Sequence, residues 1–115
     1  RDRADLVLEI DGGEKATTQT GDGPVDASFN AIKALVDHNA RLQLYQVSAV
    51  TEGTDAQATV SVRMEEDGRI VTGQSAHTDT VVASVLAYIH ALNRLFVRRE
   101  KSGSDKREIS YKDVN

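Results

Sequence analysis

Cysteine and tryptophan are absent from this 115-residue sequence, proline occurs once, and the aromatic residues are limited to three tyrosines and two phenylalanines. Without cysteine the chain can form no disulfide, thiolate nucleophile or thiolate metal ligand, which fits a reducing compartment. The few rings and the formal net charge of −4 disfavour a nucleic-acid surface. No apolar run of about 18 residues and no secretory leader is present, so we expect a cytoplasmic protein without membrane contact.

The overall composition is typical of a globular protein. Hydrophobic residues make up 39% of the chain and charged residues 28%. A chain of this length fits one domain with one core. We expect that domain to occupy residues 1–97.

The first third of the chain predicts a hairpin followed by a helix. Apolar residues alternate in "DLVLEI" at 5–10, and after the turn "DGGE" the run "KATTQT" at 15–20 returns as the second strand. A helix then begins at Pro24, because proline at the first helical position loses no hydrogen bond. Its apolar stripe comprises Val25, Phe29, Ile32, Leu35 and Val36.

The middle of the chain predicts three strands and a second helix. The strand "RLQLYQVSAV" at 41–50 shifts its apolar phase between Leu44 and Tyr45, which indicates a bulge or burial on both faces. After a turn at 51–55, alternating residues at 56–66 and the pair Asp-Gly at 67–68 predict a hairpin whose second strand is 69–75. A helix over about 79–98 buries an apolar stripe of Val82, Val85, Leu86, Ile89, Leu92 and Phe96.

Two stretches of the chain resemble each other. In 20–35 and again in 72–92 a strand ends at Thr-Gly, a short loop passes an Asp, and a helix of similar pattern begins. This degenerate repeat predicts an α+β fold of antiparallel sheets packed with two helices. The first repeat supplies two strands where the second supplies three, so we expect a strand to be missing at the amino end. From 98 to 115 periodicity is lost, which predicts a polar, flexible tail.

Side chains suited to catalysis are scattered. The spacing of the three histidines makes no metal cluster: His38 is expected at a helix end, His90 on the surface, and His77 in a loop where it could line a site. The acids at turns and strand ends form no general acid and base pair. They are Asp55, Glu65, Glu66, Asp67 and Asp79.

The stretch "GDGP" at 21–24 stands directly before the first helix. Gly21 and Gly23 allow a tight turn that exposes backbone N–H groups, which together with the positive end of the helix dipole can hold a carboxylate or phosphate. A simpler interpretation is that the loop only ends a strand and caps the helix, with Asp22 or Asp26 accepting from the free N–H groups. The local sequence favours this simpler interpretation.

Three segments together resemble a known family. They are "GDGPVDA" at 21–27, "LYQVSAVTEGTDAQATVSVRMEEDGR" at 44–69 and "TDTVVASVLAYIHALNRL" at 78–95. The span from about Leu6 to Leu95 is similar to the carboxy-terminal regulatory domain of 2-isopropylmalate synthase, which citramalate synthase shares. The resemblance implies two strand-strand-strand-helix units related by a pseudo-twofold axis. It also implies a homodimer that binds the end-product amino acid near its interface.

The same resemblance implies a set of ligand-binding residues. The glycine loop and helix start would hold the amino acid's carboxylate through Gly21, Gly23, Val25 and Asp26. The side-chain pocket would comprise Leu42, Tyr45, Ala49 and Ala56, and the second repeat would add Thr78, Asp79 and Thr80. Either Asp79 or a backbone carbonyl would take the ammonium group.

The resemblance also implies what this stretch does not do. The family's catalytic barrel and its divalent metal lie in another part of the enzyme, so we expect no catalysis and no cofactor in this domain. We expect it to bind leucine and to inhibit acetyl-CoA condensation in the parent enzyme, whose catalytic domain is then a partner. The alternatives are an isoleucine sensor of citramalate synthase and a dimerisation module without a ligand. The missing strand would leave a sheet edge for a partner chain or a shifted pairing to cover.

Overall fold

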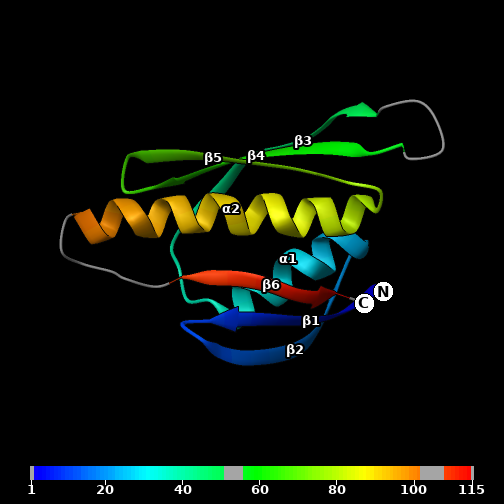
Figure 1. Cartoon of the computed structure of the whole chain (residues 1–115), viewed down its shortest axis with the longest axis horizontal. Helices are drawn as coiled ribbons and strands as arrows, with labels where there is room; N and C mark the ends of the chain where they lie inside the picture. The colour runs from blue at the N-terminus through cyan, green and yellow to red at the C-terminus, as the bar shows by residue number, and fades with distance from the viewer. Residues whose placement is uncertain (1, 51–55, 102–107, 115) are drawn as a thin grey trace.

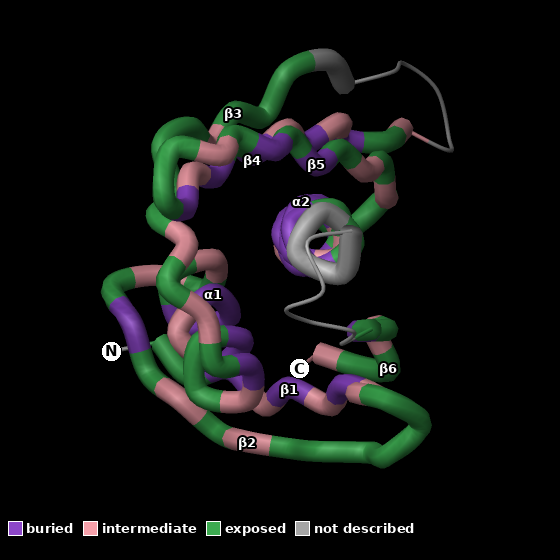
Figure 2. Tube along the Cα trace, turned by 90° about the vertical axis from the view of Figure 1, so that its left-hand side faces the viewer, coloured by how far each residue is buried: buried purple, intermediate pink, exposed green. Residues whose placement is uncertain are grey.

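The two helices lie between two three-stranded antiparallel sheets (Figures 1 and 2). This computed structural model describes residues 2–50, 56–101 and 108–114, with all their side chains except those of 49–50 and 98–101. The elements are β1 (Asp2–Ile10), β2 (Gly13–Gly21), α1 (Pro24–Leu35), β3 (Arg41–Val50), β4 (Ala58–Glu66), β5 (Arg69–His77), α2 (Thr80–Lys101) and β6 (Ile109–Val114). The predicted α+β class is confirmed.

Both predicted hairpins are present and share one turn geometry. Asp11 and Gly12 join β1 to β2 with φ of 53° and 82°, and Asp67 and Gly68 join β4 to β5 with φ of 52° and 81°. Two successive residues with positive φ match the twist of antiparallel strands, and the Asp-Gly pair suits this backbone. The repeated turn supports the predicted internal repeat.

The core lies between the sheets and the helices. In β4 the alternation is as predicted, with Ala58, Val60, Val62 and Met64 all buried. In β1 the buried positions are Ala4, Leu6 and Leu8, whereas Ile10 is only partly buried. β5 runs to His77, two residues further than predicted.

The strand β3 contains a bulge, one position away from the predicted one. Its register on β4 shifts between Leu42 and Leu44, and again between Val47 and Val50. Because the first shift skips Gln43, Leu42 and Tyr45 pair with the buried Met64 and Val62. Burial on both faces is wrong, since β3 is the edge of its sheet and is exposed at all described side chains except Tyr45. The predicted turn at 51–55 lies outside the described residues.

Each helix buries one stripe, as predicted. In α1 Phe29, Ile32 and the C-cap residue Val36 are buried, while Val25 and Leu35 are half-buried. In α2 four of the six predicted positions are buried, while Val82 and Leu86 are half-buried. The α2 stripe is wider than predicted because small residues let the helix approach β5 closely. The additional buried residues of α2 are Ala83, Ser84, Ala87, Tyr88, Ala91 and Leu95.

Gly73 lies where α2 crosses β5. A methyl group at this position would fall on the carbonyl oxygen of Ala87 and 2.6 Å from the backbone nitrogen of Ala91. The second Thr-Gly pair therefore does not end a strand as predicted; it allows helix and strand to touch. The first pair does end its strand, at Gly21.

The predicted flexible tail is wrong for residues 109–114. They form β6, which pairs antiparallel with β1 and completes the first sheet in the order β2-β1-β6. By the internal repeat, β6 beside β1 occupies the place that β3 has beside β4. Local sequence does not reveal this pairing, because the hydrogen bonds of β6 are made with the distant strand β1.

The connection between the two repeats is held by buried polar groups. His38 lies beyond the end of α1; its Nδ1 accepts from the N–H of Ala40 and its Nε2 lies 3.3 Å from the hydroxyl of Tyr88. Burial raises the pKa of Tyr88 to about 12. Glu66, expected on the surface, is buried and accepts the N–H of Asn39 at 3.2 Å. His90 is exposed, as predicted.

One helix is long and apolar enough to cross a membrane by length and composition. It is the α2 window Thr80–Val97, with a mean hydropathy of 1.5, so the expectation that the chain contains no such run is wrong. Within the fold 61% of this window is buried. The apolarity of α2 is therefore accounted for by its place between the two sheets.

Candidate functional site

The start of α1 has no side-chain cap. Gly23 is its N-cap residue, with φ 149°, and Pro24 follows at the first position. The first N–H groups of a helix have no intrahelical acceptor, and here no side chain accepts from them. The earliest intrahelical bond runs from the N–H of Ala27 to the carbonyl of Gly23, at 2.9 Å. The N–H groups of Val25 and Asp26 precede it in the first turn.

The loop before α1 is fixed by hydrogen bonds that do not involve the N–H groups of Val25 and Asp26. The carboxylate of Asp26 turns back and accepts the N–H of Asp22 at 2.8 Å. Gly21 is buried against the helix start, and a Cβ there would lie 2.6 Å from the carboxylate oxygen of Asp26. The side chain of Asn30 donates to the carbonyl of Thr20 at 3.0 Å and ties α1 to the end of β2. The capping interpretation is therefore wrong for Asp26, because its carboxylate accepts a hydrogen bond from the loop residue Asp22 and does not cap the helix.

The start of α2 is built differently. Asp79 Oδ1 accepts the N–H groups of Val81 at 2.8 Å and Val82 at 3.3 Å, which is a side-chain N-cap. The N–H of Asp79 donates to Nδ1 of His77 at 2.9 Å. Thr78 and Thr80 are exposed. The helix start of the second repeat is thus already occupied by a carboxylate of the chain itself.

Tyr45 joins the two helices to β3. Its hydroxyl lies 2.8 Å from the hydroxyl of Ser84 on α2, and its ring meets the edge of Phe29 on α1 at 5.7 Å between centroids. Val25, one turn before Phe29, packs against the same core cluster. Of the predicted residues, Tyr45 therefore contacts Phe29 on α1, and Val25 and Tyr45 both pack against the core cluster.

The other predicted pocket residues are less closely placed. Leu42 lies near the start of β3 with 39% of its surface exposed, and Ala56 is half-buried ahead of β4. No hydrogen bond or ring contact among the described residues links either of them to the start of α1. Ala49 belongs to β3, but its side chain lies outside the described residues.

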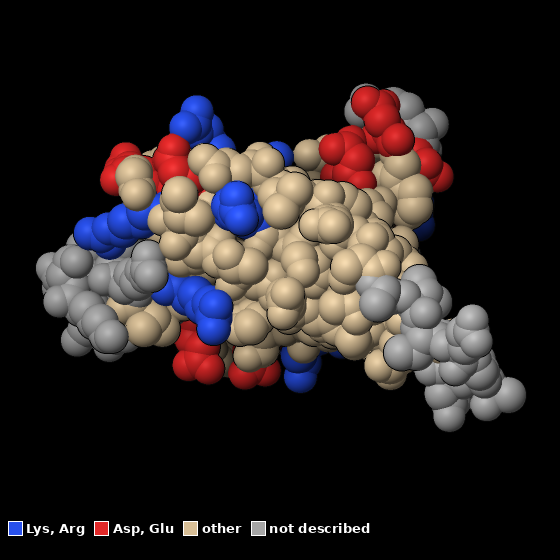
Figure 3. Space-filling model, turned by 90° about the horizontal axis from the view of Figure 1, so that it is seen from above, with Lys and Arg blue, Asp and Glu red and all other residues tan. Residues whose placement is uncertain are grey.

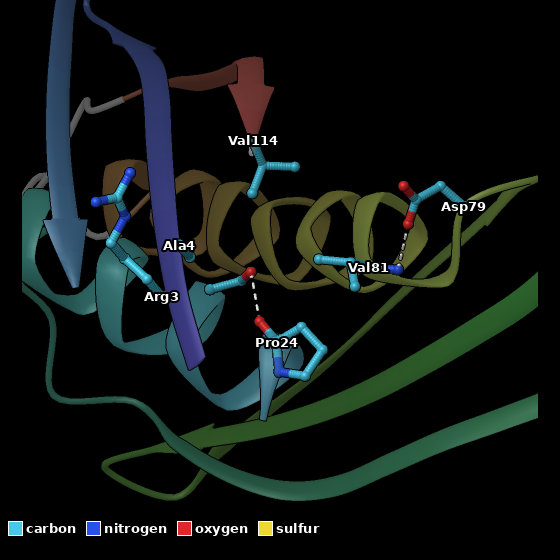
Figure 4. A pocket seen from close by; sticks show the side chains of 7 residues that line it. Arg3, Ala4, Pro24, Asp79, Val81 and Val114 are labelled. Atoms are coloured by element: carbon cyan, nitrogen blue, oxygen red, sulfur yellow. Dashed lines mark hydrogen bonds between the residues drawn. The ribbon is translucent and has the colours of Figure 1, made fainter. Parts of the chain in front are cut away.

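A cavity of about 280 Å³ lies where the starts of both helices face the first sheet (Figure 4). Its lining residues are Arg3, Ala4, Pro24, Ser28, Asp79, Val81 and Val114. On α1 the cavity faces Pro24 and Ser28, which lie about 100° around the helix from Val25 and Phe29. Asp79 is the one predicted site residue that lines it. No local sequence pattern indicates this cavity, because the distant strand β6 supplies Val114.

Charges near the cavity are paired. Arg3 forms a 3.0 Å ion pair with Asp5. The hydrogen bond that Thr18 donates to Asp5, with a smaller contribution from the charge of Arg3, holds the pKa of Asp5 below its usual value. In the part of the chain that the structure describes, no group of three or more His, Cys, Asp or Glu residues could hold a metal ion. The chemistry that the uncapped start of α1 supports is anion binding by backbone amides.

Comparison with known proteins gives one family. Residues 1–96 match the model of the LeuA allosteric (dimerisation) domain. The chain is 65% identical over 99 residues to the 2-isopropylmalate synthase of Caulobacter sp. strain K31 and 57% identical over 99 residues to that of Bradyrhizobium sp. strain BTAi1. It is 55% identical over 100 residues to that of Rhodopseudomonas palustris strain TIE-1. These matches cover 86 to 87% of this chain but only 19% of each relative.

Proposed function

This chain belongs to the LeuA allosteric (dimerisation) domain family, and from that premise we propose that it binds leucine and transmits feedback inhibition to a 2-isopropylmalate synthase. In this proposal the domain is non-catalytic and cytoplasmic. The condensation of acetyl-CoA with 2-oxoisovalerate, and the divalent metal that it uses, belong to the catalytic part of the longer enzyme. The similar proteins are 2-isopropylmalate synthases, which favours leucine over the isoleucine of a citramalate synthase.

The observation that carries the proposal is the uncapped start of α1. A free carboxylate placed there accepts from the N–H groups of Val25 and Asp26 and lies at the positive end of the helix dipole. The side chain of Asp26 does not compete, since it accepts from Asp22 in the loop. At α2 the corresponding place is taken by Asp79, so we assign one carboxylate site to each chain.

The apolar part of the effector then lies on the side of α1 that carries Val25. Tyr45 bounds this side, and its hydroxyl is fixed by Ser84, so that the ring has a defined position. For the ammonium group we favour a backbone carbonyl as acceptor. Asp79 is less suited, because its Oδ1 already caps α2.

We propose that the domain forms a homodimer through the sheet that contains β3. Its edge strand exposes Leu42, Leu44 and Val47, each between 39% and 41%. Figure 3 looks onto this sheet from outside and shows mostly uncharged atoms across its middle, with charged residues gathered toward the ends. A second copy would cover these apolar side chains.

In this proposal, inhibition results from a coupling between the leucine site of this domain and the catalytic site of the longer enzyme. Leucine can lower the activity of the catalytic part only if it binds one arrangement of the whole enzyme more tightly than another. Tyr45 is a suitable element for such coupling, because it contacts both helices from the exposed strand β3.

Isothermal titration calorimetry tests the ligand assignment. We expect leucine to bind more tightly than isoleucine or valine. Gly23→Ala forces a side chain onto a backbone with φ 149°, and we expect binding to weaken by about tenfold, the worth of one charge-assisted hydrogen bond.

The matched control is Gly12→Ala. Gly12 also has positive φ and open space around a Cβ, but it lies in the β1–β2 turn. This variant should lose some stability and keep leucine affinity. Equal binding heats for the three amino acids, or no heat for any of them, would refute the leucine assignment. A dimer whose Tm does not change with any of the three amino acids would support a dimerisation module without a ligand.

A further inference from the structure

The second sheet ends at β5, and this strand carries none of the usual features that prevent pairing at an exposed edge. Such edges are commonly blunted by proline, bulges or charged side chains. β5 pairs with β4 without a register shift, and its residues 70–76, IVTGQSA, contain neither proline nor a charged residue. By contrast, β3 at the other edge has two register shifts, and the edge strand β2 of the first sheet carries Glu14 and Lys15. If the edge of β5 is to stay unpaired, it needs protection from another element.

Two side chains of α2 make hydrogen bonds to this edge. Arg94 donates to the carbonyl of Thr72 at 3.0 Å. Nδ1 of His90 lies 3.2 Å from the backbone nitrogen of Gln74 and 3.1 Å from its carbonyl oxygen, so it accepts from the first or donates to the second according to its tautomer. Because these backbone groups bond to α2 and not to β4, they belong to the outer edge of the sheet. His90 and Arg94 therefore occupy positions that an added strand would need.

The spacing of the two side chains suits a helix that lies along a strand. Residues four apart rise about 6 Å along a helix, and residues two apart extend about 6.6 Å along a strand. Side chains on successive turns of α2 can therefore reach alternate residues of β5. Figure 2 shows α2 directly beneath β4 and β5. The close contact at Gly73, where a Cβ would meet the backbone of Ala87 and Ala91, brings the helix near enough for this reach.

We propose that His90 and Arg94 are gatekeepers, which keep the outer edge of β5 closed to the β5 strand of a second copy. The partner strand is an identical one, because a twofold axis at Gly73 would set Thr72 of each copy opposite Gln74 of the other. The backbone groups that now bond to α2 would then bond across the axis. This role does not depend on leucine binding, so it would stand if the leucine assignment failed.

Sedimentation velocity tests the proposal with a His90→Ala/Arg94→Ala double variant of the full chain. Both side chains are exposed, so their removal leaves the core intact. At rising protein concentration the double variant should form species with about twice the mass of the wild-type species or more. Lys33→Ala is the control, because it removes an exposed basic side chain from the other helix. It should leave the wild-type mass unchanged.

A third substitution identifies the surface through which the double variant associates. Gln74→Pro removes an N–H from the outer edge of β5, and proline is tolerated where the N–H of an edge strand points away from the sheet. Added to the double variant, Gln74→Pro should restore the wild-type mass, since the backbone group needed for pairing is gone.

A peptide tests the same edge without a second folded copy. A fluorescently labelled peptide of residues 69–77 should bind the double variant at least about tenfold more tightly than it binds wild type. The same peptide with the Gln74→Pro change should not bind.

Four results would overturn the proposal. The first is a double variant with the wild-type mass at every concentration, and the second is equal affinity of the peptide for wild type and double variant. The third is a larger species that persists after Gln74→Pro, which would place the association on another surface. The fourth is a loss of amide hydrogen-exchange protection in β4 of the double variant, which would show that His90 and Arg94 hold the sheet itself together.

Discussion

Replacing Gly73 by alanine should be the most damaging single-methyl change in this fold. The new Cβ would meet the backbone of α2 at Ala87 and Ala91, and neither a carbonyl oxygen nor a backbone nitrogen can rotate out of the way. To restore ordinary van der Waals distances, α2 must move away from β5 by about 1 Å. That movement opens gaps along Val60 and Val62 on the sheet and Val85 and Leu92 on the helix, all of which are fully buried.

We expect a loss of about 3 kcal/mol in the free energy of unfolding, the upper part of the range for overpacking a core. For a domain of this size this corresponds to a fall in Tm of about 10 °C or more. Urea unfolding followed by circular dichroism measures it. Gly13→Ala is the control, because a Cβ there has only the carbonyl oxygen of Ile10 within 4 Å, at an ordinary 3.6 Å. A Gly73→Ala protein within about 0.5 kcal/mol of wild type would refute the close contact between α2 and β5.

Two further predictions follow from single side chains. Asp79→Ala removes the α2 cap and should lower the free energy of unfolding, measured in urea titrations, by about 1 kcal/mol. Asp79→Asn keeps an acceptor oxygen and should lower it less. Equal losses in the two variants would contradict the cap. Because burial raises the pKa of Tyr88 to about 12 from the ordinary value near 10, its neutral form is favoured in the folded state. The stability that this shift contributes is complete below pH 10 and is lost as the pH rises toward 12. Tyr88→Phe should therefore flatten the decline of Tm over this interval. An unchanged decline would count against a raised pKa of Tyr88 in the folded protein.

The elements that sequence predicted well are those whose signals are local. The turns at Asp11-Gly12 and Asp67-Gly68 need positive φ, and the alternation from Ala58 to Met64 reports a single buried face. The place of the bulge in β3 was predicted one residue too late. Apolar periodicity cannot distinguish an inward Leu42 from an outward Leu44 when both side chains lie at an exposed sheet edge.

The features that sequence reasoning missed depend on distant partners. Nothing in "ISYKDV" distinguishes a strand from a polar tail until β1 offers its edge. The glycines allowed an uncapped start of α1, but the local sequence favoured capping by Asp22 or Asp26, and the turning of Asp26 toward the loop depends on how Gly21 packs. The members of the family-derived ligand set stay predictions.

The pairing of Leu6 with Val114 has a consequence for the order of folding. The elements β3, β4, β5 and α2 follow one another along the chain and can assemble from neighbouring segments, whereas β6 reaches β1 from beyond both helices and the whole second sheet. Contacts of such large sequence separation form slowly, so we expect the second sheet to form before the pairing of β6 with β1.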